Sequence, residues 1–367
     1  MGVLILIVIL VIILAKCTIF ADDSANSQKK FLLFSGIIIV LVFSLRNAEI
    51  NIGSDLNNYY RLYSRAISSS SVREFLNANP FEKGYLLINW LLSRIVKWPQ
   101  FILIFQAAFC IGITFRFIYK YSDDLLISVL GFMSLGVMQF YLTGFRQSIA
   151  ISICLLALEM AERRKFLKFA LLVALATSIH QTAIIFSIVY ILINMRITKI
   201  TIIIETGMVL GLAQIVPKII AVGNDVFERD YAGGFGGNSM GGLINVIIAV
   251  AVLGLMYLQF NLNKGENSSF EDSSKNRKGL ELTKDKINFK LMPILILGTG
   301  FYGMRYQALV LERISLYFTP TLFILLPQVI NKMFNKQSRK LLRIIVVSGM
   351  VFLAYWRLRN IPYSTIL

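Results

Sequence analysis

The sequence predicts an all-α protein that crosses a membrane many times. Of its 367 residues, 56% are hydrophobic and the mean hydropathy is +0.69, whereas a soluble domain is usually about 45–50% apolar. Three long runs, 2–15, 31–44 and 243–260, contain no charged side chain. Runs of this length and composition are typical of transmembrane helices.

The apolar runs predict about twelve spans, and a thirteenth, short re-entrant helix at 84–95. The whole chain, 1–367, is expected to form a single integral membrane domain. The predicted spans are 2–20, 31–48, 101–119, 124–142, 145–161, 165–180, 182–195, 198–220, 242–262, 290–308, 314–332 and 340–358.

Basic residues in the short loops predict the orientation of these spans. Most lysines and arginines fall in alternate loops, which the positive-inside rule assigns to the cytoplasm. Those loops are 21–30, 116–124, 161–168, 196–199, 263–289 and 332–343. The loop at 263–289 is the longest of them and is charged. Both termini are then expected on the outer side.

The outer side is expected to carry one long loop and a glycine-rich one. The long periplasmic loop is 49–100, and the glycine-rich loop is 223–241. Segment 84–95 lies within the long loop and is too short to span, so it is read as an interfacial helix. Its Trp90, with the nearby Trp98, suits a membrane surface.

The charge, the cysteine and histidine counts and the absence of known motifs exclude several classes of protein. The net charge of +17 lies mainly in the loops between apolar runs, so nucleic-acid binding is not expected. Three scattered cysteines and a single histidine predict neither a disulfide framework nor a His-based metal centre. Motifs of soluble enzymes such as Walker A, GxSxG and HExxH are absent.

Polar residues at the outer ends of the spans are the candidate site residues. Each of these residues also has a structural explanation that involves no function. An arginine there can extend to lipid phosphates, a lone histidine can be a packing residue, and Asp55 and Glu82 can be loop carboxylates. Several arginines on the outer side together oppose the positive-inside rule. A pyrophosphate bound at that face would offset the free-energy cost of placing them there. Tyr59 and its neighbours suit stacking against sugar rings. The set is Arg46, Asp55, Tyr59, Glu82, Arg146, Gln147, His180, Arg305, Arg313 and Tyr317.

The order of these motifs resembles the EpsG family of Wzy-type polymerases of bacterial exopolysaccharide, capsule and O-antigen. The resemblance covers about 46–320. The family's usual Gly-Thr-Asp reads Gly53-Ser54-Asp55 here, which keeps the carboxylate. The motifs in chain order are "IGSDLNNYY", "FEKGYLLIN", "GFRQSIAISICLLAL", "SIHQTAIIF" and "ERISLYFTP".

The resemblance implies a metal-independent glycosyltransferase of GT-C-like architecture in the bacterial cytoplasmic membrane, without a cofactor. It would transfer a growing glycan from undecaprenyl pyrophosphate to the terminal sugar of another lipid-linked repeat unit at the outer face. Asp55, Glu82 or His180 would be the general base, and Arg146, Arg305 and Arg313 would meet the leaving pyrophosphate. A chain-length regulator and a flippase are the protein partners that such a polymerase would have.

Other functions remain open at this stage. A transporter or flippase for lipid-linked sugars would also need outer arginines, but it should carry a polar path through its spans. An O-antigen ligase differs only in its acceptor. An acyltransferase using His180, or a structural membrane subunit, would also have this composition.

Overall fold

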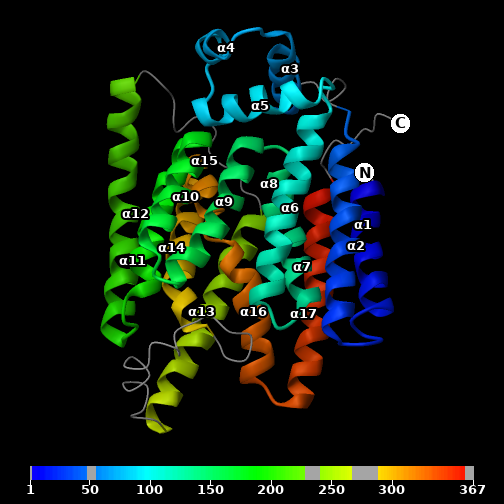
Figure 1. The fold of residues 1–367 in the computed structure, drawn as a ribbon. Coiled ribbons are helices and arrows are strands. Elements are labelled where there is room, and N and C mark those ends of the chain that lie inside the picture. Colours follow the sequence, from blue (N-terminus) through cyan, green and yellow to red (C-terminus); the bar gives the residue numbers. More distant parts are fainter. Residues whose placement is uncertain (1, 48–54, 228–239, 267–287, 360–367) are drawn as a thin grey trace.

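The computed structural model describes residues 2–47, 55–227, 240–266 and 288–359, and these form helices joined by short turns (Figure 1). The outer loop 223–241 and the cytoplasmic loop 263–289 lie mostly outside the described residues. The first helices are α1 (Gly2–Cys17), α2 (Ala25–Ser44), α3 (Asp55–Ser68), α4 (Val72–Ala78), α5 (Lys83–Ile95), α6 (Phe101–Tyr121), α7 (Leu125–Ser134), α8 (Val137–Tyr141) and α9 (Phe145–Glu162). The others are α10 (Phe166–Ile179), the 3₁₀ helix η1 (Gln181–Ile188), α11 (Val189–Asn194), α12 (Lys199–Phe227), α13 (Met240–Glu266), η4 (Phe289–Leu291), α14 (Met292–Gly303), η5 (Met304–Tyr306), α15 (Leu309–Ser315), α16 (Pro320–Met333) and α17 (Lys336–Leu358).

The prediction of an all-helical, apolar protein is confirmed for the described residues. Four helical segments are long and apolar enough to cross a membrane by themselves: Ala25–Ser44, Phe101–Tyr121, Leu243–Leu262 and Lys336–Leu358. Shorter apolar helices cover Val3–Cys17, Leu125–Ser134, Phe166–Ile179 and Gln181–Asn194. The number of twelve spans stays a prediction.

Several predicted spans are broken rather than continuous. The span expected at 124–142 is divided into α7 and α8 at Gly136, whose φ of 94° lies in the left-handed region that favours glycine. The span at 182–195 begins as η1 and continues as α11, and the region 289–333 is divided among five shorter helices. Hydrophobicity does not report such breaks, because a broken helix is as apolar as a straight one.

The centre of the bundle is formed by helices that are buried on all sides. Every residue of α7 is buried, and α9 and α16 are buried along nearly their whole length. A helix that is apolar all round belongs in the interior. Polar contacts join these helices: Ser128 Oγ donates to the Phe323 carbonyl at 2.6 Å, and Gln106 Nε2 donates to Ser148 Oγ at 2.8 Å.

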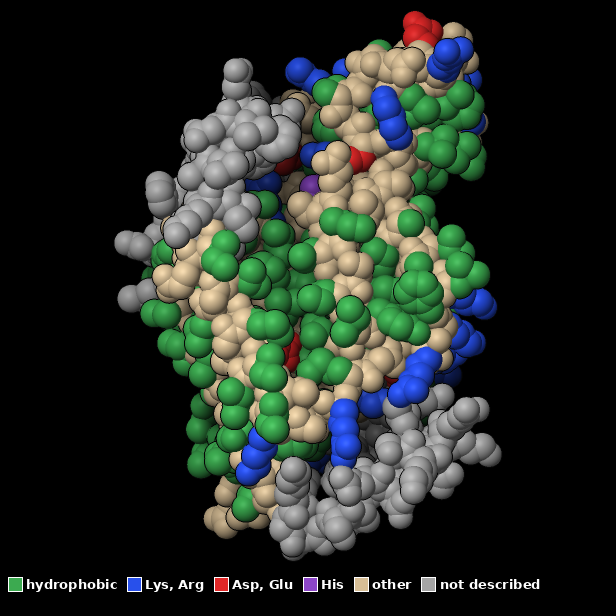
Figure 2. All heavy atoms as spheres, turned by 90° about the vertical axis from the view of Figure 1, so that its left-hand side faces the viewer, with side chains coloured by type: hydrophobic (Ala, Val, Ile, Leu, Met, Phe, Trp, Pro, Cys, Tyr) green, Lys and Arg blue, Asp and Glu red, His purple; other side chains and the backbone are tan. Residues whose placement is uncertain are grey.

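The turns predicted to be cytoplasmic share one end of the bundle. In Figure 1 the connections α1–α2, α6–α7, α11–α12 and α16–α17 all lie at the lower end. There Glu159 forms ion pairs with Arg116 at 2.7 Å, Lys120 at 2.9 Å and Arg163 at 3.0 Å. Figure 2 shows basic side chains below a broad apolar band, as expected for a protein embedded in a bilayer.

Helices α3, α4 and α5 form a cap over the opposite end (Figure 1). The Tyr63 hydroxyl donates to the Val96 carbonyl at 3.0 Å, and Arg94 donates to carbonyls at the end of α3. Helix α5 runs across the bundle axis, and Leu87, Leu91 and Ile95 form an exposed apolar stripe along it. Helix α5 covers the segment 84–95, and its place at the membrane interface stays a prediction.

Candidate functional site

Three predicted site residues that lie far apart in the sequence meet beneath the cap. A guanidinium N–H of Arg146 donates to Oε2 of Glu82. His180 Nδ1 lies 3.3 Å from Oε1 of the same carboxylate, and the backbone N–H of Gln181 donates to that oxygen at 3.5 Å. The side chains of Glu82, Arg146 and His180 are called the Glu82 cluster below.

Each member of the Glu82 cluster stands at the end of a helix. Glu82 is the N-cap residue of α5, and its side chain does not cap that helix, so it is free to face the bundle. Arg146 lies in the first turn of α9. His180 joins α10 to η1 in an extended conformation, at the end of α10 opposite the basic turn 163–165. This matches the predicted position of His180.

Gly84 allows the cap to approach the bundle closely enough to bring these residues together. A Cβ at position 84 would lie 2.3 Å from Ser178 Oγ and 2.6 Å from the Ser178 carbonyl oxygen. Real Cβ atoms do not approach other atoms this closely. The "FEKGY" segment therefore needs glycine two residues after Glu82, because α5 rests directly on the backbone at the end of α10.

Glu82 is held as a carboxylate. Burial alone would raise its pKa, but the close approach of His180 Nδ1 and the charge of Arg146 outweigh burial and lower the pKa to about 2. A carboxylate with so low a pKa is a weak base. Glu82 is thus better suited to orienting His180 and Arg146 than to accepting a proton from a substrate.

Arg146 is paired within the protein as well as placed near the surface. Its guanidinium lies 4.9 Å from the centre of the Phe81 ring, and its side chain is 26% exposed. The carboxylate of Glu82 balances its charge. A bound anion is therefore not needed to explain why an arginine stands at this end of the bundle.

The first turn of α9 adds uncapped backbone donors beside Arg146. Its N-cap is Gly144, which has no side chain to accept from the first N–H groups. Such N–H groups have no intrahelical partner, and together with the helix dipole they favour an anion. The start of α9 thus has no side-chain cap beside the Arg146 guanidinium, although Phe145 and Gln147 in the same turn are buried.

Two other predicted residues link the surrounding helices. Gln147 Nε2 donates to the Arg313 carbonyl at 2.6 Å, which ties α9 to α15. The Tyr317 hydroxyl lies 3.1 Å from Thr182 Oγ1, which ties the segment after α15 to η1. The side chain of Arg313 is exposed and forms no ion pair with the described residues.

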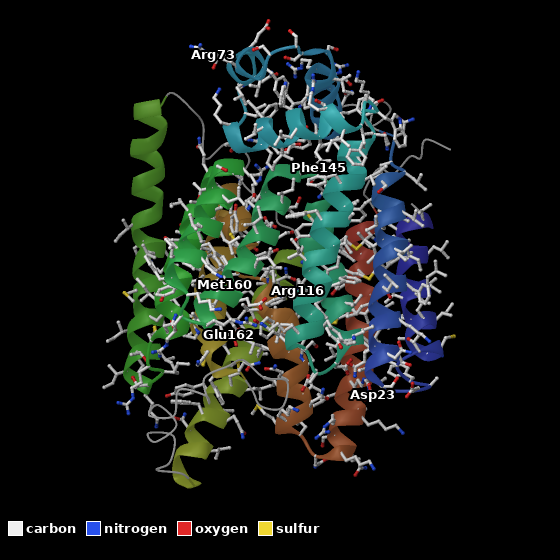
Figure 3. The ribbon with its side chains drawn as sticks, in the orientation of Figure 1. Asp23, Arg73, Arg116, Phe145, Met160 and Glu162 are labelled. Atoms are coloured by element: carbon white, nitrogen blue, oxygen red, sulfur yellow. The ribbon has the colours of Figure 1, made fainter. Side chains whose placement is uncertain are left out.

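Arg46 and Tyr59 lie differently from the expectation of direct substrate contact. Arg46 is buried and donates to the backbone carbonyls of Phe43 and Leu142. Tyr59 is buried and stacks on Phe145 with ring centres 4.9 Å apart, so that ring face is not available to a sugar. Figure 3 shows Phe145 just beneath the cap. Both residues hold the start of α9 in place.

Arg305 and Asp55 stand outside the Glu82 cluster. Arg305 is buried, 3.6 Å from Glu312 Oε1 and 3.4 Å from the Tyr302 hydroxyl. Asp55 is exposed at the first residue of α3, one helical turn before Tyr59. Neither Glu312 nor Tyr302, which Arg305 contacts, belongs to the Glu82 cluster.

The Glu82 cluster lies in a recess at the edge of the apolar band. Figure 2 shows the histidine below the cap with acidic and basic side chains around it, directly above the band of hydrophobic side chains. The side chains of His180 and Glu82 are 19% and 11% exposed. A ligand whose tail lies in the bilayer and whose polar group lies at its surface could reach this recess.

The part of the chain that the structure describes holds no cluster of three or more His, Cys, Asp or Glu suited to a metal ion. No set of residues is therefore assigned to a metal or a cofactor. The groups available for chemistry here are an imidazole, guanidinium groups, a fixed carboxylate and backbone N–H groups.

The site also contains residues that the sequence did not single out. Phe81 and Gly84 flank Glu82, and their place inside the "FEKGY" motif was the available signal. Phe145, which Tyr59 and Arg46 contact, directly precedes Arg146. Thr182 had no signal beyond lying near His180.

The chain matches the family model described as "EpsG family" over residues 29–365, nearly its whole length. The matched region includes every residue of the Glu82 cluster. No curated protein and no solved structure matches the chain.

Proposed function

Because the chain belongs to the EpsG family of Wzy-like polysaccharide polymerases, we propose that it joins lipid-linked repeat units into a glycan at the outer face of the cytoplasmic membrane. The donor would be a growing glycan on undecaprenyl pyrophosphate, and the acceptor would be the terminal sugar of another lipid-linked unit. The observation that carries the proposal is the pairing of Glu82 with both Arg146 and His180.

His180 is the general base in this proposal. Its Nδ1 faces the carboxylate of Glu82, which leaves Nε2 to accept a proton. Imidazole is the side chain best suited to proton transfer near neutral pH. Glu82 would fix the orientation of the ring and stabilise the imidazolium that forms, as a carboxylate does in other carboxylate–histidine pairs.

The reaction makes one bond and breaks one bond at the anomeric carbon of the donor. The acceptor hydroxyl oxygen bonds to that carbon while its proton passes to His180 Nε2. The bond from the same carbon to the pyrophosphate oxygen breaks, and the pyrophosphate leaves with the electron pair. Positive groups near the leaving oxygen lower the barrier, because charge develops there in the transition state.

The leaving pyrophosphate would be held by the first turn of α9, by Arg146 and by the exposed Arg313. Arginine suits this task because its fork of N–H donors binds two phosphate oxygens at once. Gln147 and Tyr317 would position α15 and η1 around the ligand. Arg46, Tyr59 and Arg305 would act by holding helices, and Asp55 would lie at the margin of the site.

The position of the recess supports a lipid-linked substrate. In Figure 2 the single histidine lies just above the apolar band, where the headgroups of a surrounding bilayer would lie. An undecaprenyl chain would lie beside the band while its pyrophosphate entered the recess from the side. The same level explains why the cap, which covers the recess, has an apolar stripe on α5.

Deletion of the gene tests the proposal against its rivals. Loss of long surface glycan with single repeats retained identifies a polymerase, whereas loss of all surface repeats identifies a ligase or a flippase. The purified protein should then join lipid-linked repeats in vitro, and His180→Gln should abolish joining while leaving the protein folded. Full activity of a well-folded His180→Gln protein would remove His180 from the mechanism.

A further inference from the structure

The cap contains a second hollow, separate from the Glu82 cluster. It lies between the end of α3 and α4, with a volume of about 460 Å³. Pockets that hold small ligands commonly measure about 300–1,000 Å³. It is lined by Ser64, Arg65, Ser68, Ser69, Ser70, Glu74 and Ala78, with Phe75 and Asn79 on its floor.

We propose that this hollow, the cap hollow, binds a neutral or weakly charged stretch of carbohydrate, namely the glycan that the Glu82 cluster lengthens. The substrate class follows from the hydrogen-bonding groups of the walls. The link to the growing glycan rests on the proposed function, whereas carbohydrate binding by itself does not.

Three of the four serines that line the cap hollow present their hydroxyl groups as hydrogen-bond acceptors. Ser64 Oγ donates to the Tyr60 carbonyl at 3.1 Å, Ser68 Oγ donates to the Ser64 carbonyl at 3.2 Å, and Ser69 Oγ donates to the Ser71 carbonyl at 3.0 Å. Their protons are thus used inside the cap, while the oxygen lone pairs remain. A ligand for such walls must itself carry many donors, as the hydroxyl groups of a sugar do.

Two exposed charged groups complete the rim. The Glu74 carboxylate accepts from sugar hydroxyls, and the Arg65 guanidinium donates to ring or hydroxyl oxygens. Neither forms an ion pair with another described residue. A phosphate would be a poor ligand, because the serine lone pairs and Glu74 would repel it.

The floor is apolar on one side and polar on the other. Phe75 and Asn79 are 3% and 5% exposed and lie one turn apart at the end of α4. Asn79 Nδ2 donates to the Phe75 carbonyl at 2.8 Å, whereas its Oδ1 has no hydrogen-bond partner among the described residues. Because Phe75 is as buried as Tyr59, its ring offers no stacking face, and recognition of a sugar rests on the polar groups of the walls and rim.

Chain geometry connects the cap hollow to the Glu82 cluster. Asn79 precedes Glu82 by three residues, and three residues span at most about 11 Å. A glycan that leaves the recess would therefore reach the cap hollow within a few sugar units. Contacts there would keep the product bound between successive additions and favour long chains.

Binding to the full-length protein in nanodiscs tests carbohydrate recognition directly. The probe is the delipidated repeat oligosaccharide of the host's own surface polysaccharide, observed by saturation-transfer NMR and titration. Arg65→Ala and Glu74→Ala should each weaken binding about tenfold or more, since hydrogen bonds to charged groups are lost. Arg73→Ala is the matched control, because Arg73 (labelled in Figure 3) precedes Glu74 in α4 and is not one of the residues that line the hollow.

Product length tests the link to polymerisation. With lipid-linked repeats, Glu74→Ala should join the first two units at the wild-type rate and give shorter chains, while Arg73→Ala should give wild-type chains. Unchanged oligosaccharide binding in both Arg65→Ala and Glu74→Ala would overturn the carbohydrate site. Weakened binding with unchanged chain length would overturn its link to the growing glycan. If the wild-type protein joins no units but Glu74→Ala still weakens binding, the proposed function fails and the carbohydrate site stands.

Discussion

Gly84→Ala is the substitution that most directly tests how the cap positions the Glu82 cluster. The added Cβ would stand 2.6 Å from the carbonyl oxygen and 2.7 Å from the carbonyl carbon of Ser178, where ordinary contact begins at 3.4 Å. These neighbours are backbone atoms, so they cannot turn aside as a side-chain tip would. Helix α5 must therefore move away from α10 by about 0.7 Å to restore contact at the carbon.

That movement would weaken the Glu82–His180 pair. A shift of about 0.7 Å along the line between Nδ1 and Oε1 would lengthen the 3.3 Å contact to about 4 Å, beyond hydrogen-bonding range. Overpacking of this kind costs about 1–3 kcal/mol in stability. A misplacement of about 1 Å in a catalytic group can cost about a hundredfold in rate.

The assay is joining of lipid-linked repeats by purified protein, with thermal unfolding in the same detergent. Gly112→Ala in α6 is the matched control, because a Cβ there meets no heavy atom within 4 Å. We expect Gly84→Ala to lose most of its activity and some stability while Gly112→Ala keeps both. Wild-type activity and stability in Gly84→Ala would refute the close approach of α5 to α10.

The remaining predictions concern charge and backbone geometry. Arg146→Ala should lower the joining rate about a hundred- to a thousandfold, which corresponds to about 2.7–4 kcal/mol. Arg146→Lys should keep only part of the wild-type rate, because lysine lacks the guanidinium fork. Equal activity of the lysine variant and the wild type in the joining assay would contradict this. Glu82→Gln should lower the free energy of unfolding at neutral pH by about 3 kcal/mol, since the pKa of Glu82 falls from 4.5 to about 2 on folding. The stabilisation by ionised Glu82 is present above pH 4.5 and is lost as the pH falls towards 2, so the difference from wild type should shrink over that range; a constant difference in pH-dependent denaturation would argue against it. Gly136→Ala should destabilise the α7–α8 junction, measured by thermal unfolding, because φ is 94° and the Cβ would lie 2.6 Å from Arg357 Nη1; an unchanged melting temperature would contradict this.

The sequence alone predicted which residues share an end of the bundle. Glu82, Arg146 and His180 each follow or precede an apolar run, and the basic turns assigned those ends to one side. Alternation of spans fixes the end at which a residue lies, so this part of the site could be inferred without coordinates. Helical period and run length were enough for that purpose.

The contacts within the site could not be inferred in the same way. Nothing in the sequence shows that Glu82 lies between Arg146 and His180, because Glu82 precedes each of them by more than sixty residues. The burial of Tyr59 could not be predicted from the sequence either. A tyrosine in a polar loop suits sugar stacking and also suits packing on Phe145, and only the three-dimensional arrangement of α3 and α9 distinguishes the two.

The breaks in the helices could be predicted from the sequence only in part. Gly136 gave a local signal, since an isolated glycine within an apolar run can end a helix, but most glycines in this chain lie inside unbroken helices. The break between α10 and η1 has no glycine or proline. It coincides with His180, which pairs with Glu82 in an extended conformation. Tertiary contacts there outweigh local helix propensity.

Two unfavourable contributions to the free energy and one favourable contribution explain the position of Arg146. An arginine is unfavourable on the outer side by the topology signal, and unfavourable again in the first turn of a helix, whose dipole repels positive charge. Glu82 offsets both costs by pairing with Arg146 at that helix start. Because the pair is nearly neutral, the pyrophosphate of the proposed function would be attracted mainly by the exposed Arg313 and by the first turn of α9. Arg146 would then contribute directed donors rather than excess charge, so the proposal predicts that the geometry of its guanidinium fork matters more than its charge alone.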